Sequence, residues 1–204
     1  MRIIVSFIAF LTVFLMAGLA VAAKIPSACS AQAPRGAPVW NGNELPLTSL
    51  CRTAYIALHD DSKLVPDFVS WLLTSHNALG CFPRKDSFAP DPDLPPDRRA
   101  ELADYEGQHD IYDRGHFAPN SDFAWDAEVQ RESFYLSNMS PQASHLNQWE
   151  WGSLEAATRA WVITRNSLAI DNVDVDRCMK LVDIGIECLK CRPRSVPPPF
   201  QFGS

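Results

Sequence analysis

The strongest hydrophobic pattern lies at the N-terminus, where Ile3 to Leu19 is almost wholly apolar. Arg2 places a positive charge before this run, and Ala20-Val21-Ala22 fits the small residues of a cleavage site after it. The pattern predicts a signal peptide over residues 1–22, and hence a secreted or periplasmic protein with no stable membrane association after cleavage. An apolar run of about 18 residues can also span a bilayer, so an uncleaved anchor is the alternative.

After the leader, apolar and polar positions predict short elements separated by loops. Lys24 to Asn43 is rich in Pro, Ser, Ala and Gly and predicts a lead-in segment held by contacts. Apolar residues at mixed spacing in Leu50–Leu58 predict a short element, and the β-branched and aromatic run Phe68–Leu73 predicts a strand. Phe88 to Asp97 carries four prolines, which exclude a helix or a central strand and predict a surface loop.

The centre of the chain, Tyr105 to Trp161, predicts the order strand, strand, helix. Ser133 to Met139 alternates well enough for a short strand, and Ser140 and Pro141 are expected to end it. A helix is expected to begin near Gln148.

The expected helix has a polar face beside an apolar one. At about 100° per residue, Glu155 and Arg159 lie roughly 80° and 120° around the helix from Asn147, so one face carries all three. The adjoining stripe is apolar and contains Trp151, Leu154, Ala157 and Trp161. Such a helix is expected to pack with its polar edge beside a cleft.

Length and composition limit the architecture and the partners. The chain has 204 residues, 47% of them hydrophobic, which suits one core and predicts one catalytic domain over residues 23–165. A net charge of −6 excludes a protein that coats nucleic acid by electrostatics alone, so any nucleic-acid site must be local. All six cysteines follow the leader, and an even count in an exported chain favours disulfides. Cys29 with Cys51 is the first candidate pair, because both lie in the polar N-terminal segment.

Candidate chemistry gathers at Asp113-Arg114-Gly115-His116 and on the expected helix. Hydrolysis of a phosphodiester needs a base to deprotonate water, a cation to screen the phosphorane and a means to stabilise the departing 3′ oxygen. A histidine near its ordinary pKa of about 6.5 can accept the proton. The carbonyl oxygen of Asn147 suits magnesium, and Glu155 could hold one of the waters that magnesium retains.

Three ordered blocks carry a resemblance to the DNA/RNA non-specific endonuclease family, the ββα-metal nucleases. Asp113 to His116, with Ala118-Pro119 after it, resembles the family signature, and Ser137 to Gln142 resembles the second block. Asn147 through Glu155 to Arg159 resembles the third. The resemblance implies an α+β fold with a ββα-metal core on a mostly antiparallel sheet.

The resemblance also implies roles for individual residues. His116 would activate water, Asn147 would be the only direct protein ligand of one Mg²⁺, for which Mn²⁺ would be able to substitute, and Glu155 would contact a water on that ion. Arg114 and Arg159 would steady the phosphate or the transition state. Arg84, in a segment that looks like the one preceding the family signature, would reach the substrate phosphate. The implied activity is an exported, sugar-non-specific endonuclease that cuts DNA and RNA and leaves 5′-phosphates.

Each site residue also has a structural interpretation. His116 alone would more often be a structural histidine. Asn147 with Glu150 forms a helix N-cap and capping box pattern. Glu155 and Arg159 are spaced as a surface ion pair. Asp113 is expected to organise its loop or orient Arg114, and not to bind metal.

The C-terminal part of the chain departs from the family pattern. The resemblance covers Cys29 to Trp161, and Asp171 to Ser204 looks foreign to it. We therefore expect residues 166–204 to be an atypical tail, frameshifted or truncated, with part of the sheet missing or replaced. A CxxC in this tail, Cys188 to Cys191, predicts a disulfide or free thiols rather than a zinc site. The alternative function is a non-catalytic exported relic or binding protein of the same family with an incomplete fold.

Overall fold

The computed structural model describes residues 24–38, 47–107, 111–165 and 167–173. The predicted signal peptide over 1–22 lies outside these residues, and so do residues 174–204 of the predicted tail. Within the described part, no helix is both long enough and apolar enough to cross a membrane.

Four strands form the main sheet in the order β1-β2-β3-β6, and each neighbouring pair is antiparallel. The strands are β1 (Leu47–Cys51), β2 (Tyr55–Asp60), β3 (Val65–Thr74) and β6 (Ser167–Val173). The predicted strand Phe68–Leu73 lies inside β3. The segment Leu50–Leu58, predicted as one short element, divides between the end of β1 and the start of β2.

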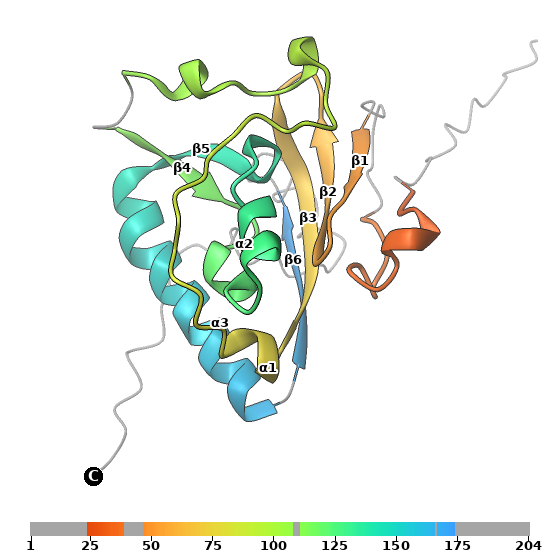
Figure 1. Ribbon diagram of the computed structural model, residues 1–204, viewed down its shortest axis with the longest axis vertical. Coiled ribbons are helices and arrows are strands. Elements are labelled where there is room, and N and C mark those ends of the chain that lie inside the picture. Colours follow the sequence, from red (N-terminus) through yellow and green to blue (C-terminus); the bar gives the residue numbers. More distant parts are fainter. Residues whose placement is uncertain (1–23, 39–46, 108–110, 166, 174–204) are drawn as a thin grey trace, which may run out of the picture.

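Helices cover one face of this sheet, as Figure 1 shows. They are α1 (Ser75–Ala78), α2 (Ala127–Glu132) and α3 (Gly152–Arg165), the last preceded by a π-helical turn, Leu146–Trp151. Short 3-10 turns lie at Ser27–Cys29, Pro96–Arg98, Leu102–Tyr105, Asn120–Phe123 and Leu136–Asn138. The long helix α3 leads from the second sheet back to β6 (Figure 1).

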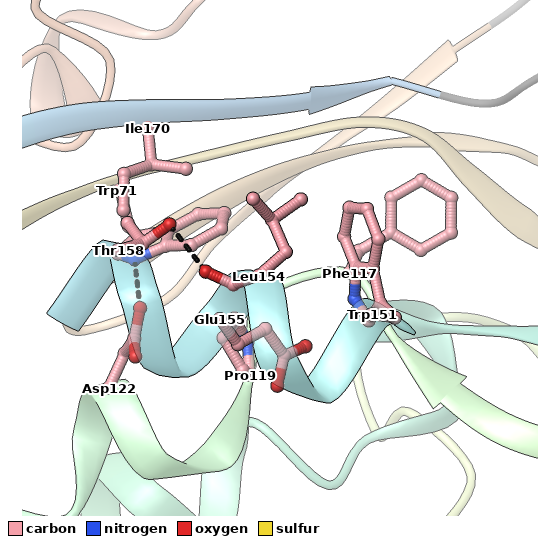
Figure 2. Close-up of a pocket in the computed structure, with 9 residues that line it drawn as sticks. All are labelled: Trp71, Phe117, Pro119, Asp122, Trp151, Leu154, Glu155, Thr158 and Ile170. Carbon is pink, nitrogen blue, oxygen red and sulfur yellow. Dashed lines mark hydrogen bonds between the residues drawn. The ribbon is translucent and has the colours of Figure 1, made fainter. Parts of the chain in front are cut away.

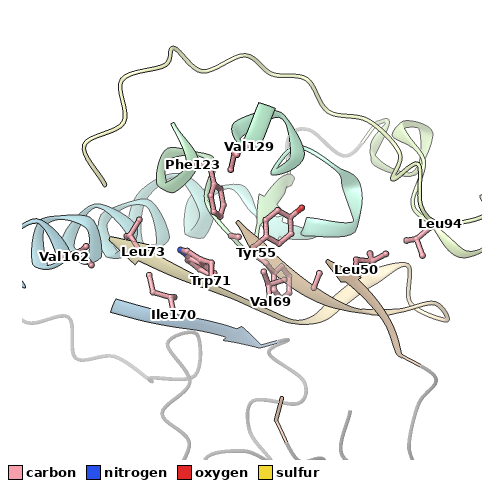
Figure 3. Packing of buried hydrophobic residues seen from close by; sticks show 13 residues of the cluster. Leu50, Tyr55, Val69, Trp71, Leu73, Leu94, Phe123, Val129, Val162 and Ile170 are labelled. Atoms are coloured by element: carbon pink, nitrogen blue, oxygen red, sulfur yellow. The ribbon is translucent and has the colours of Figure 1, made fainter. Parts of the chain in front are cut away.

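The main hydrophobic core fills the space between the sheet and the helices (Figure 3). Tyr55 and Trp71 project from the sheet onto Phe123, with ring centroids 5.6 and 6.4 Å from that of Phe123. Val162 of α3 and Ile170 of β6 join the same cluster. The core therefore ties the long helix and the last described strand to the centre of the domain.

A second sheet consists of β4 (Tyr112–His116) and β5 (Met139–Ala143), paired antiparallel. The predicted strand at Ser133–Met139 is wrong except at Met139, the first residue of β5, because the residues before it lie in turns, a single bridge residue and a 3-10 helix. The Asn138 side chain exchanges hydrogen bonds with the Ala118 backbone at 3.0 and 2.9 Å, and it donates to the Ser133 carbonyl at 2.9 Å. These bonds hold the segment compact until β5 begins.

Pro141 was expected to end a strand, but it lies inside β5 opposite Arg114. Proline cannot donate a ladder hydrogen bond, so it is restricted largely to edge strands. The β4-β5 sheet has two strands in the described part of the chain, so each of them has an open edge. Pro141 is tolerated for that reason.

The helix predicted to begin near Gln148 starts differently. Leu146–Trp151 forms a π-helical turn, and regular α-helix begins at Gly152. The capping box proposed for Asn147 and Glu150 is wrong, since the turn has no side-chain cap. A π-turn holds more residues per turn than an α-helix, so the angles computed from Asn147 across this junction do not apply.

A disulfide joins Cys29 to Cys51, the pair that the sequence suggested first, with their Cα atoms 5.8 Å apart. It attaches the lead-in segment to the end of β1. Cys29 is buried with Ala33 and Ile56 in a small hydrophobic cluster. Cys81 is an exposed free thiol.

Candidate functional site

The β4 strand presents the signature residues on two faces. Because side chains alternate along a strand, Arg114 and His116 point to one face and Asp113 and Gly115 to the other. Gly115 is required by space: a Cβ at this position would lie 2.2 Å from the Oε1 atom of Gln142 on β5. The close approach of Gln142 therefore explains why a glycine stands at this position.

His116 lies at the end of β4, packed against two aromatic rings. Its ring meets Phe134 edge to face, with centroids 5.1 Å apart, and its centroid lies 5.8 Å from that of Phe88. The residue is 8% exposed, and its Nε2 atom has no hydrogen-bond partner in the described structure. A histidine with a dry, unengaged nitrogen is able to accept a proton from a molecule that enters beside it.

This environment keeps the imidazole neutral. Burial, and after it the positive charge of Arg84, lower the pKa of His116 to about 3, while Asp86 acts in the opposite direction. Desolvation disfavours the charged form of a histidine, and a nearby cation does the same. The side chain is therefore unprotonated at physiological pH, which a general base requires, but its pKa lies well below the ordinary value of about 6.5 expected from the sequence, so the ring is a weaker base than expected.

The same two rings hold two arginines. The Arg114 guanidinium carbon lies 4.2 Å from the Phe88 ring centroid, and that of Arg84 lies 5.2 Å from the Phe134 centroid. Arg84 also donates from Nε to Asp86 at 2.7 Å. The structure thus brings Arg84, Arg114 and His116 together around Phe88 and Phe134, a pair of residues that sequence reasoning did not assign to the site.

Asn147 lies on the π-helical turn and is oriented by Asp113. Its Nδ2 atom donates to Asp113 Oδ2 at 2.8 Å, and Gln148 Nε2 and Ser144 Oγ each donate to Asp113 at 3.0 Å. Burial alone would raise the pKa of Asp113, but these hydrogen bonds outweigh it and lower that pKa. From the sequence, Asp113 was expected to organise its loop or orient Arg114, and its contact with Asn147 was missed.

The Asp113 contact determines which end of the Asn147 amide is available. A carboxylate only accepts hydrogen bonds, so it takes the amino group and leaves the carbonyl oxygen for another ligand. A neutral, hard oxygen of this kind fits Mg²⁺, which keeps several waters and needs few protein ligands. The described residues include no group of three His, Cys, Asp or Glu side chains placed to hold a metal.

Glu155 and Arg159 lie further along α3. Glu155 lines a shallow pocket, with about 20 Å³ of free space, between α3 and the sheet (Figure 2). The other lining residues are Trp71, Phe117, Pro119, Asp122, Trp151, Leu154, Thr158 and Ile170. Phe117 follows His116 directly, so this pocket adjoins the end of β4.

Arg159 has a buried partner. Its Nη1 atom donates to Asp122 Oδ1 at 3.0 Å, and Trp71 Nε1 donates to Asp122 Oδ2 at the same distance. Burial raises the pKa of Asp122 to about 6, although Arg159 and Trp71 both act to lower it. The sequence paired Arg159 with Glu155 as the structural alternative, and it did not identify Asp122.

Comparisons with known proteins agree on one family. The model of the family described as DNA/RNA non-specific endonuclease matches residues 36–173, more than half of the chain. This match continues beyond Trp161, where the motifs ended, and includes β6. Residues 174–204 lie outside it, so an atypical tail there stays a prediction.

Curated relatives are nucleases of greater length. Human nuclease EXOG is 34% identical over 110 residues, which make up 53% of this chain and 29% of that protein. Human endonuclease G is 44% identical over 62 residues, 30% of this chain and 20% of that protein. Nuclease C1 of Cunninghamella echinulata is 43% identical over 74 residues, 36% of this chain and 29% of that protein. The chain therefore spans less than a third of the length of each.

A solved structure, the EndoG/EndoGI complex, contains a similar fold. Its matching chain gives a TM-score of 0.63 at 26% identity, covering 74% of this chain and 60% of that one. The predicted α+β fold of the ββα-metal type is confirmed by this likeness and by the helices and antiparallel sheets described above.

The predicted secreted or periplasmic location is contradicted. Human nuclease EXOG and human endonuclease G are named as mitochondrial proteins, as are relatives from Bos taurus and Schizosaccharomyces pombe. The apolar N-terminal run had suggested export, but that reasoning rested on hydropathy and one cleavage pattern. These relatives are distant, so their location is not transferred to this chain.

Proposed function

The chain belongs to the DNA/RNA non-specific endonuclease family, and from this membership we propose that it hydrolyses phosphodiester bonds in both DNA and RNA, leaving 5′-phosphates. The observation that carries the proposal is the neutral, buried His116 flanked by Arg84 and Arg114. A neutral imidazole can accept a proton from water, and two permanent cations can stabilise the negative charge that develops on a phosphate diester.

His116 acts as the general base. Its Nε2 atom accepts a proton from the attacking water, and the cationic imidazole that results returns the proton to solvent after the bond breaks. The rings of Phe88 and Phe134 pack against this imidazole, and its Nε2 atom has no hydrogen-bond partner among the described residues. The low pKa of His116 means that the base is available across the neutral range.

Arg84 and Arg114 bind the non-bridging oxygens of the phosphate. Arginine presents several donors and a permanent charge, which suit a phosphate group better than a base edge. Contacts to phosphate carry no information about sequence or sugar, so this proposal accounts for activity on both DNA and RNA. Arg159 is proposed to add charge for the transition state, held in place by Asp122.

Asn147 would hold one Mg²⁺ through its Oδ1 atom, with Mn²⁺ as a substitute. Asp113 accepts a hydrogen bond from Asn147 Nδ2 and would thereby keep Oδ1 available to the ion. Glu155 would accept hydrogen bonds from the hydration shell of the ion. When bound, the ion supplies positive charge that screens the phosphate and stabilises the departing 3′ oxygen.

The domain boundaries remain part of the proposal. The sequence suggested a nuclease domain over residues 23–165 and an atypical, frameshifted or truncated tail over 166–204. Because β6 pairs with β3 and the family match reaches residue 173, we propose that the domain continues to residue 173 and that the tail begins after it. An intact mass, together with translation of the coding DNA in its other frames, tests the tail. A family-like segment downstream in another frame supports the frameshift, and its absence from both frames opposes it.

The alternative function is a non-catalytic relic or binding protein of the same family with an incomplete fold. Purified protein would be tested for Mg²⁺-dependent nicking of plasmid DNA and degradation of RNA, alongside thermal melting. Products with 5′-phosphates accept label from polynucleotide kinase only after phosphatase treatment. A cooperative melt without cleavage would favour the relic and reject the proposed activity.

A further inference from the structure

Phe88 and Phe134 form the centre of a five-residue cluster with His116, Arg84 and Arg114. The two phenyl rings meet edge to face, with centroids 5.0 Å apart, and both contact the imidazole. Each ring also has one guanidinium above it. A single aromatic pair therefore contacts the base and both cations of the proposed site.

The pair is held by the backbone of two segments distant in sequence. Ala89 donates to the Phe134 carbonyl at 3.3 Å, and Leu136 donates to the Ala89 carbonyl at 2.9 Å. Ala89 and Tyr135 form a parallel bridge at the same place. Phe88 comes from the proline-rich loop and Phe134 from the turn after α2, so the fold, and not local sequence, brings the rings together.

A guanidinium above an aromatic ring gains cation–π attraction and loses freedom of rotation. The gain is larger where the pair is shielded from water. Arg114 and Phe88 are both partly buried, whereas Arg84 is about half exposed over the fully buried Phe134, so the Arg114 contact is the better shielded of the two. An arginine fixed in this way has less conformational entropy to lose when it meets a phosphate. The same rings remove water from around His116.

We propose that Phe88 and Phe134 are positioning residues of the nuclease site, which hold Arg84, Arg114 and His116 in one arrangement for a single phosphate. This inference rests on the proposed function. Neither ring reacts, and each acts through the side chains that it contacts. Phe88 also packs against the small hydrophobic cluster that contains Tyr105 and Met139, so the test must separate positioning from packing.

A double-mutant cycle makes that separation. Phe88→Leu, Arg114→Ala and the double variant would be compared with the unmodified chain by kcat/KM on plasmid DNA. Arg114→Ala should lower kcat/KM in both backgrounds. We expect its effect to be about 3- to 30-fold smaller in the Phe88→Leu background than in the unmodified chain, because the ring contact is already lost. Phe88→Tyr keeps the ring and should restore both the activity and the coupling. If Phe88→Leu does not fold, Phe88→Met replaces it, since methionine fills irregular space.

A matched control comes from α3, where Arg165 lies over the Trp161 ring at 5.8 Å, on the exposed surface. The cycle of Trp161→Leu with Arg165→Ala contains the same kind of contact outside the site. The effects of these two substitutions on kcat/KM should be additive in free energy. Additive effects in the Phe88 cycle too would overturn the inference.

A second readout needs no activity. Titration of the His116 imidazole by NMR, in metal-free protein, should show its pKa moving upward in Phe88→Leu, because water then reaches a ring that Arg84 and Asp86 still face. An unchanged His116 titration would oppose the positioning role. If the unmodified chain binds but does not cut nucleic acid, the proposed function fails, and this titration still decides whether the aromatic pair sets the state of His116.

Discussion

Two buried groups should give the stability of this protein an unusual dependence on pH. The pKa of His116 is lowered to about 3 and that of Asp122 is raised to about 6, both chiefly by burial. For His116 the unfolded chain binds more protons between about pH 3 and 6.5, so the stabilisation by the neutral ring is present above pH 6.5 and is lost on acidification. For Asp122 the folded chain binds more protons between about pH 3.8 and 6, so its contribution is present in acid and is lost as pH rises.

The sizes follow from the shifts. One pKa unit corresponds to about 1.4 kcal/mol, so crossing the full pH window changes the free energy of unfolding by about 5 kcal/mol for His116 and by about 3 kcal/mol for Asp122. Between about pH 4 and 6, the two groups change the free energy of unfolding with pH in opposite directions and at nearly the same rate, so their effects cancel there. Removing either group should expose the slope of the other.

Urea unfolding at a series of pH values would measure this in the unmodified chain, His116→Gln and Asp122→Asn. Differences between a variant and the unmodified chain remove the contributions of all the other carboxylates. The advantage of the unmodified chain over His116→Gln should shrink by about 1.4 kcal/mol per pH unit as pH falls from 6 to 4. The difference for Asp122→Asn should have the opposite slope. A flat difference for His116→Gln would mean that its ring is hydrated, and would refute the dry site on which the proposed base depends.

Substitutions at three positions test the remaining roles. His116→Ala should lower cleavage by about 100- to 10,000-fold with Mg²⁺ affinity little changed, measured by plasmid nicking and calorimetry; wild-type cleavage in a preparation free of other nucleases would reject the assignment. Asn147→Ala should raise the Mg²⁺ concentration needed for half-maximal activity, and a loss of stability alone would show that the residue is structural. Asp113→Ala should also raise the Mg²⁺ requirement, because the Asn147 amide loses the acceptor that orients it. Asp113→Asn keeps an acceptor, so its Mg²⁺ requirement should lie between those of the unmodified chain and Asp113→Ala. Equal activity in the unmodified chain and both Asp113 variants would exclude an orienting role.

Features that depend on neighbours in sequence could be predicted. The strand within β3 follows from its β-branched and aromatic residues, since such side chains pack well on a pleated surface. The signature at β4 was identified because four adjacent residue types specify it. In both cases the information lies inside one short segment.

Features that depend on distant partners were missed. Asn147 carries a good capping pattern, yet its amide meets Asp113, 34 residues away in sequence. Arg159 meets Asp122 across 37 residues. A capping or i,i+4 rule considers only one helix, so it cannot weigh the stronger attraction of a buried or charged partner on another element.

The proline-rich loop shows how such distant contacts come to control the site. Four prolines correctly exclude a regular element there, but they give no position for the loop. Its position comes from Arg52, which pairs with the buried Asp91 and with Asp93, while Ser137 also donates to Asp91. A buried carboxylate left without its arginine would carry a large cost, so alternative placements of the loop are disfavoured. Because Phe88 precedes Asp91 by only three residues, the ion pair that places the loop also places the ring beside His116.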